Sequence, residues 1–145
     1  MLARDRGYPT ITHQVLRCPM LDDRCESYSA RMLDGGAIWD RATNLFGWTA
    51  LLGERRGTDD VSPYTAPARA KELSGLPRTY LDVGTVETFR DEVIEFAQRL
   101  CEAGVGVDLH LWGGAFHGFD LIPAAAVSRA ARATRDEFFR RALAG

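Results

Sequence analysis

The order of segments between residues 78 and 112 constrains the fold more than any other feature of the sequence. The run RTYLDVG (78–84) is rich in aromatic and β-branched residues and closes on a glycine, which predicts a strand. VDLHLW (107–112) alternates apolar and polar residues, as in a half-buried strand near a sheet edge. The amphipathic segment between them, residues 90–104, predicts a helix that ends at a glycine. Strands joined by a helical crossover pair in parallel, so this order predicts an α/β fold.

The remaining segments extend the same architecture in both directions. HQVLRCPML (13–21) reads as a buried strand, and residues 36–53 have apolar residues at helical spacing before Gly53. A last helix is expected to open at Pro123. The sequence therefore predicts a mainly parallel sheet of about three strands with helices on both faces, in one domain over residues 1–145.

The helix predicted for residues 90–104 has a clear apolar stripe. We expect the buried face to consist of Val93, Ile94, Ala97, Leu100 and Cys101. The solvent face is then expected to consist of Arg90, Glu92, Glu95 and Gln98.

Two loops follow the neighbouring strands and carry candidate functional residues. TVETFRDE supplies Glu87, Asp91 and Glu92, and GGAFHGFD supplies His117. Loops at the carboxyl ends of parallel strands meet at one edge of the sheet, so a carboxylate and an imidazole are expected side by side. Such a pair is the acid–base half of a hydrolytic triad, although the same spacing also suits a purely structural pair.

These loops carry a resemblance to a known family. LSGLPRTYLDVGTVETFRDEVIEFAQRLCEAGVGVDLHLWGGAFHGFD, with SPYTAPARA, NLFGWTALLG and CPMLDDR upstream, resembles the C-terminal part of bacterial esterases of the hormone-sensitive-lipase type, in the α/β-hydrolase superfamily. The resemblance covers practically the whole chain and implies a partial α/β-hydrolase fold. It implies that His117 is the catalytic histidine and Glu87 the triad acid, where the family commonly has aspartate; Asp91 ranks second.

Two motifs of such esterases do not occur in the sequence. They are the HGGG loop, whose amides stabilise the oxyanion, and the G-x-S-x-G nucleophile elbow. The serines are Ser27, Ser29, Ser62, Ser74 and Ser128, and none has the flanking glycines. We therefore expect the chain to begin just after the nucleophile and to be inactive alone.

The cysteines and the other histidines give no alternative chemistry. Cys18 is expected inside a strand, Cys25 in a loop and Cys101 on an apolar helix face, so none is placed on a nucleophile elbow. Their odd number and spacing predict neither a disulfide framework nor structural zinc. His13 and His110 have no ligand spacing with His117, so no metal and no cofactor are expected.

Charge and hydropathy limit the partners. A net charge of −2 without basic runs argues against nucleic acid or anionic membranes. No apolar run reaches the roughly 20 residues of a membrane span, and charges close behind Met1 exclude a signal core there, so a cytoplasmic protein is expected.

Three functions remain open on the sequence. The first is that the chain forms the acid–histidine half of a carboxylesterase acting on a small acyl ester. The second is a remnant without turnover, and the third is a binding or oligomerisation module. Because the first strand is expected to leave an open sheet edge, we expect a homo-oligomer or a complementing N-terminal half.

Overall fold

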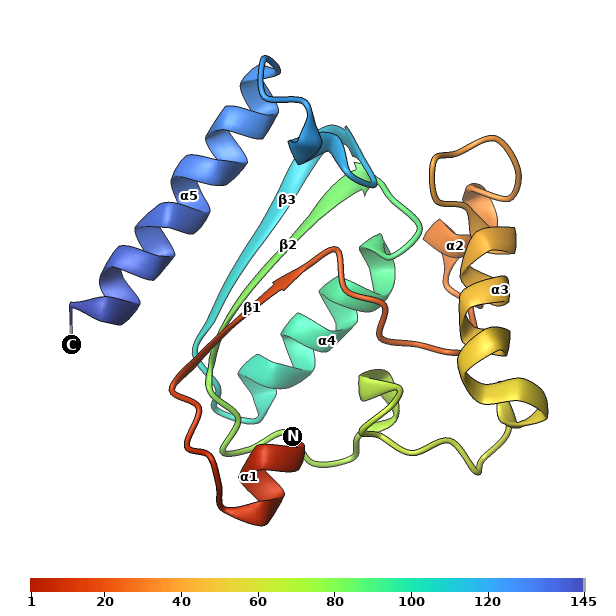
Figure 1. Cartoon of the computed structure of the whole chain (residues 1–145), viewed down its shortest axis with the longest axis horizontal. Helices are drawn as coiled ribbons and strands as arrows, with labels where there is room; N and C mark the ends of the chain where they lie inside the picture. Colours follow the sequence, from red (N-terminus) through yellow and green to blue (C-terminus); the bar gives the residue numbers. More distant parts are fainter. Residues whose placement is uncertain (145) are drawn as a thin grey trace.

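The computed structural model describes residues 1–144, which are built around a three-stranded sheet (Figure 1). All three strands run parallel, in the order β1 (His13–Arg17), β2 (Arg78–Val86) and β3 (Val107–Phe116). The helices are α1 (Leu2–Arg6), α2 (Tyr28–Met32), α3 (Arg41–Leu52), α4 (Arg90–Glu102) and α5 (Ala126–Leu143), with short 3₁₀ turns at Gly53–Arg55, Pro67–Arg69 and Phe119–Leu121. The predicted α/β class and parallel sheet are confirmed.

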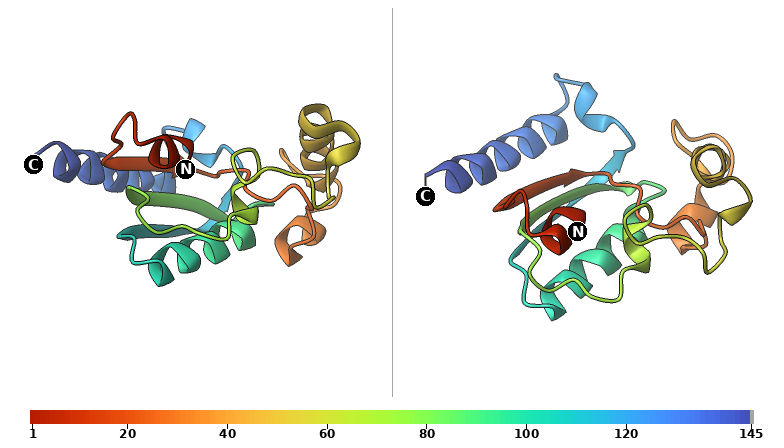
Figure 2. Two further views of the ribbon diagram at one scale, coloured as in Figure 1. Left: turned by 90° about the horizontal axis from the view of Figure 1, so that it is seen from below. Right: turned by 60° about the horizontal axis from the view of Figure 1, so that its bottom comes forward.

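Helices cover both faces of this sheet. Figure 2 shows α4 on one face and α5 on the other. The main core lies between the sheet and α4, where Leu81, Val83, Val93 and Leu100 are fully buried. Burying one such side chain contributes about 1.5–3 kcal/mol, which favours a parallel sheet covered on both sides.

The buried face of α4 differs from the predicted one. Phe96 joins Val93 and Leu100 in the core, whereas Cys101 is exposed. Glu92, predicted to face solvent, is buried because its Oε1 accepts the backbone N–H of Leu21 at 2.7 Å. Burial raises the pKa of Glu92 to about 8 despite that hydrogen bond, and nearby negative charges add to the shift.

Two helices begin later than the sequence predicts. α3 begins at Arg41 rather than at residue 36, because Asp40 caps it and accepts the backbone N–H of Thr43 at 2.8 Å. The predicted end at Gly53 is confirmed. The last helix begins at Ala126, a turn after Pro123. Residues 36–39 are therefore not helical and are free to contact the sheet edge.

β2 and β3 both continue beyond their predicted ends. An irregularity in their pairing changes the register of β3 relative to β2. Gly84 pairs with Trp112, and Val86 pairs with Phe116. Between these pairs β2 advances two residues while β3 advances four. Most of GGAF, which the sequence predicts to be a loop, therefore lies in a β-bulge of β3.

The bulge requires a glycine on the opposing strand. A Cβ atom on Gly84 would lie 2.2 Å from the carbonyl oxygen of Ala115, a distance that side-chain atoms do not tolerate. Gly84 thus allows the bulge, and the bulge brings His117 instead of Ala115 level with Glu87.

The outer edge of β1 pairs with no strand within residues 1–144, since β1 pairs only with β2. β3 forms the opposite edge, as predicted for residues 107–112. None of the helices in the described part of the chain combines the length and the apolar character needed to cross a lipid bilayer.

Candidate active site

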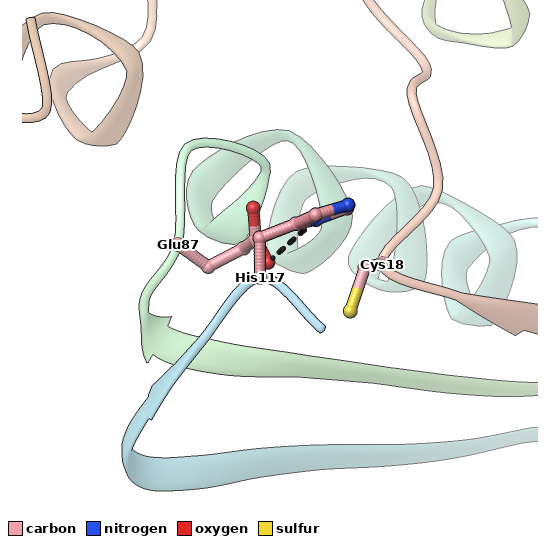
Figure 3. Close-up of side chains that lie close together, drawn as sticks. All are labelled: Cys18, Glu87 and His117. Atoms are coloured by element: carbon pink, nitrogen blue, oxygen red, sulfur yellow. Dashed lines mark hydrogen bonds and ion pairs between the residues drawn. The ribbon is translucent and has the colours of Figure 1, made fainter. Parts of the chain in front are cut away.

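Glu87 and His117 lie side by side at the carboxyl ends of β2 and β3. Each is the first residue after its strand. Oε2 of Glu87 lies 3.0 Å from Nδ1 of His117, within hydrogen-bond distance (Figure 3). The structure therefore brings together the two residues that the sequence selected for an acid–base pair.

The surroundings hold this pair in one arrangement. The Glu87 side chain is wholly buried, whereas that of His117 is 29% exposed. The His117 ring lies 5.3 Å from the ring of Trp39 and 5.6 Å from that of Phe89, which meets it edge-on. These aromatic contacts limit rotation of the imidazole, and its partial exposure keeps it accessible.

The arrangement determines which ring nitrogen can act as a base. A carboxylate at Glu87 only accepts hydrogen bonds, and in that form it requires Nδ1 of His117 as the donor across the 3.0 Å contact. Nε2 then has a free lone pair and can take a proton from a neighbouring hydroxyl. A carboxylate in this position can hold the ring in one orientation and stabilise an imidazolium.

A cavity of about 380 Å³ adjoins His117. Its lining is mainly apolar and consists of Met32, Leu33, Gly35, Gly36, Ala37, Ile38, Trp39, Val86, Phe116 and His117. Residues 36–39 line it because they lie before the start of α3. The helical spacing of apolar residues had predicted them to be part of that helix. Phe116 lines the cavity, whereas Phe119, the aromatic residue on the other side of His117, is buried beside Ala131.

Asp91, the second-ranked candidate for the triad acid, connects two helices. Its Oδ1 accepts Nε of Arg90 at 2.7 Å, and its Oδ2 accepts the backbone N–H of Ser29 at 2.7 Å. The Ser29 hydroxyl also donates to the carbonyl of Thr88. Asp91 thus ties α2 to the start of α4, with both of its oxygens occupied.

Cys18 lies at the same site, although the sequence predicts it inside a strand. It is the first residue after β1 rather than part of a strand, and its φ of 41° is in the left-handed region. Its Sγ and donor atoms of Glu87 and His117 all lie within 4.8 Å of one another. The strand-end rule that selected the loops of Glu87 and His117 also selects Cys18 when the first strand ends at Arg17, as it does in the structure.

The Cys18 thiol is not prepared for nucleophilic attack. Burial raises its pKa to about 12, and the negative charges of Glu87 and Asp82 add to the shift. Burial likewise raises the pKa of Cys25 to about 12. Reactive cysteines have lowered pKa values, so these two environments favour the neutral thiol.

Known proteins similar to this chain are esterases. A family model described as "alpha/beta hydrolase fold" matches residues 1–121. Carboxylic ester hydrolase LipN of Mycobacterium tuberculosis is 31% identical over 122 residues, covering 81% of this chain and 32% of that protein. Esterase LipI of the same organism is 33% identical over 133 residues, covering 85% of this chain and 39% of that protein. The chain spans about a third of the length of these relatives.

Solved structures agree in fold. The structure titled "Bacterial Heroin Esterase" has a TM-score of 0.88 and 43% identity, covering 92% of this chain and 43% of that one. Esterase LipW from Mycobacterium marinum has a TM-score of 0.88 and 34% identity, covering 97% of this chain and 44% of that one. From the family match, the parallel sheet and these likenesses together, we conclude that the chain belongs to the α/β-hydrolase family, in its hormone-sensitive-lipase-type branch.

Proposed function

We propose that this chain forms the acid–histidine part of the active site of a carboxylic-ester hydrolase. A further polypeptide segment supplies the serine nucleophile and the oxyanion loop, and the substrate is a small acyl ester. The observation that carries the proposal is the 3.0 Å contact between the wholly buried Glu87 carboxylate and Nδ1 of the accessible His117. Its place at two adjacent strand ends, in a chain similar to esterases, favours catalysis over a structural pair.

In this mechanism His117 acts twice. Nε2 removes the proton from the serine hydroxyl as the oxygen attacks the ester carbonyl, and it then protonates the departing alcohol. Water deacylates the serine by the same proton transfers in the second half of the reaction. Glu87 stays ionised and keeps Nδ1–H directed toward itself throughout.

Complementation tests the proposal. The 145-residue chain is mixed or co-expressed with the N-terminal segment of a related esterase that carries the HGGG and G-x-S-x-G motifs. We expect hydrolysis of short p-nitrophenyl acyl esters by the pair and by neither part alone. His117→Ala should lower kcat of the pair by about 10⁴-fold or more, and Glu87→Gln by about 10³–10⁴-fold, because each removes a member of the triad.

Two matched variants separate this role from general damage. His110→Gln changes a histidine within β3, and Asp91→Asn changes the carboxylate that binds Ser29; both should leave kcat within about threefold, since neither residue contacts the pair in the proposed mechanism. Persistent activity in His117→Ala would contradict the proposal. Activity of the chain alone that disappears in His117→Ala would instead show that it contains its own nucleophile.

A second candidate function is assembly through the sheet edge. Within residues 1–144 the outer edge of β1 has no paired strand, and an apolar cavity of about 270 Å³ lies beside it, lined in part by Leu16, Leu21 and Phe96. An open strand edge favours association, either with a complementing segment or with a second copy. Native mass and size-exclusion chromatography distinguish these: a stable homo-oligomer that excludes the complementing segment, without turnover, favours the assembly function.

A further inference from the structure

Three different metal-binding side chains converge at the carboxyl edge of the sheet. Cys18, Glu87 and His117 are each the first residue after one of the three adjacent parallel strands. A thiol sulfur, a carboxylate oxygen and an imidazole nitrogen lie within 4.8 Å of one another (Figure 3). The convergence follows from the topology, since three parallel strands in sequential order end at one edge.

The geometry is that of a cluster rather than of a Cys–His–Glu relay. In a relay, the nucleophile and the carboxylate contact opposite nitrogens of the imidazole, which separates them by more than about 6 Å when each is at hydrogen-bond distance. Here Sγ of Cys18 lies within 4.8 Å of a Glu87 donor atom as well as of His117. The three donor atoms therefore form a compact triangle and do not lie along one line.

The charge at this point is suited to a cation. The Glu87 side chain is wholly buried, and its Oε1 has no hydrogen-bond partner within residues 1–144. Leaving such an atom unpaired costs about 1–3 kcal/mol, more when it is charged. A bound cation would compensate this oxygen, and a divalent ion would also balance a thiolate at Cys18.

We propose that Cys18, Glu87 and His117 bind a zinc ion. Thiolate and imidazole ligands favour zinc over magnesium or calcium, which prefer oxygen ligands alone. Zinc–ligand distances of about 2.0–2.3 Å in a tetrahedral site place ligand atoms about 3.5 Å apart, so donor atoms that lie within 4.8 Å of one another need to close in by at most about 1.3 Å. Three protein ligands leave the fourth position for water.

Binding requires one protonation change. The Cys18 thiol loses its proton to the solvent and the thiolate donates an electron pair to zinc, while Glu87 and the neutral imidazole each donate a lone pair. No oxidant or reductant takes part. Zinc would take the same Glu87 carboxylate and His117 ring as the proposed esterase, so the zinc-bound and the catalytic states exclude one another in one molecule. Zinc binding is measured without ester hydrolysis, so the failure of either proposal is seen separately.

Titration of the reduced, chelator-treated 145-residue chain with zinc chloride tests the site. We expect one zinc per chain and, from calorimetry in two buffers of different ionisation enthalpy, release of about one proton per zinc. Cobalt(II) should give the sulfur-to-metal charge-transfer absorption of a thiolate ligand. Cys18→Ser should abolish this absorption and weaken zinc binding by more than about 100-fold, beyond the usual effect of losing an outer-shell partner.

Cys101→Ser is the matched control, because it removes an exposed thiol on α4 and should leave both readouts unchanged. Far-ultraviolet circular dichroism checks that each variant is folded. Glu87→Gln and His117→Gln provide independent tests if Cys18→Ser does not fold, and each should weaken zinc binding at least tenfold. Unchanged zinc affinity in the folded ligand variants, a cobalt complex without charge-transfer absorption, or no zinc binding by the unaltered chain would overturn the proposal.

Discussion

Gly84→Ala is expected to lower the free energy of unfolding by about 3 kcal/mol, at the upper end of the range for overpacking. The new Cβ would meet the backbone carbonyl of Ala115 at 2.2 Å, and a backbone atom cannot move aside as a flexible side chain can. Relief requires β3 to shift at the bulge that brings His117 level with Glu87. Urea denaturation of the two proteins measures the loss.

The matched control for this substitution is Gly113→Ala. Gly113 also lies in β3 at the bulge, but an added Cβ there has no atom within 4 Å. We expect its stability to stay within about 0.5 kcal/mol of the unaltered chain, as for other surface changes. In the complemented enzyme, Gly84→Ala should also lower kcat by about 100-fold, because a shift of 1 Å in a catalytic group has effects of this size. Equal stability of the two alanine variants would refute the role assigned to Gly84.

The second expected result is a pH-dependent stability that originates at Glu92. The pKa of this side chain is raised from 4.5 to about 8 in the folded chain, chiefly by burial. Below pH 4.5 both the folded and the unfolded chain keep the proton, so the contribution of Glu92 is fully present. As the pH rises from 4.5 to 8, only the unfolded chain releases it, and stability falls by up to about 1.4 kcal/mol per pH unit before levelling off.

Glu92→Gln should remove this dependence. The amide oxygen can still accept the N–H of Leu21 but carries no charge at any pH. We expect the variant to match the unaltered chain near pH 4.5 and to be about 4 kcal/mol more stable near pH 8. Urea denaturation across this range measures the difference, and Glu95→Gln, on the exposed side of α4, is the control. Parallel stability curves for Glu92→Gln and the unaltered chain would show that Glu92 is not protonated in the fold.

Local patterns in the sequence were sufficient to predict the three strands in order, the helices α3, α4 and α5, the parallel sheet and the approach of the TVETFRDE loop to His117, whereas α2 was not predicted and Glu87 was selected through the family resemblance. Period-two and period-3.6 spacing report burial directly, and parallel topology sends successive strand ends to one edge. The same patterns misjudged Glu92 and Cys101, because spacing alone does not show how far a helix is rotated or which backbone amide a buried carboxylate will accept. Residues 36–39 were similarly assigned to a helix that Asp40 begins later.

The sequence by itself determined the class of fold, the family resemblance and the two residues of the acid–base pair. Tertiary structure alone decided that four residues of β3 lie opposite two residues of β2, which aligns His117 with Glu87. It also decided that Cys18 lies beside this pair, at the end of the third strand. Both depend on contacts between segments far apart in the chain, such as the approach of Ala115 to Gly84. Such contacts leave no periodic signal in a single sequence, since periodicity records only which side of one element is buried.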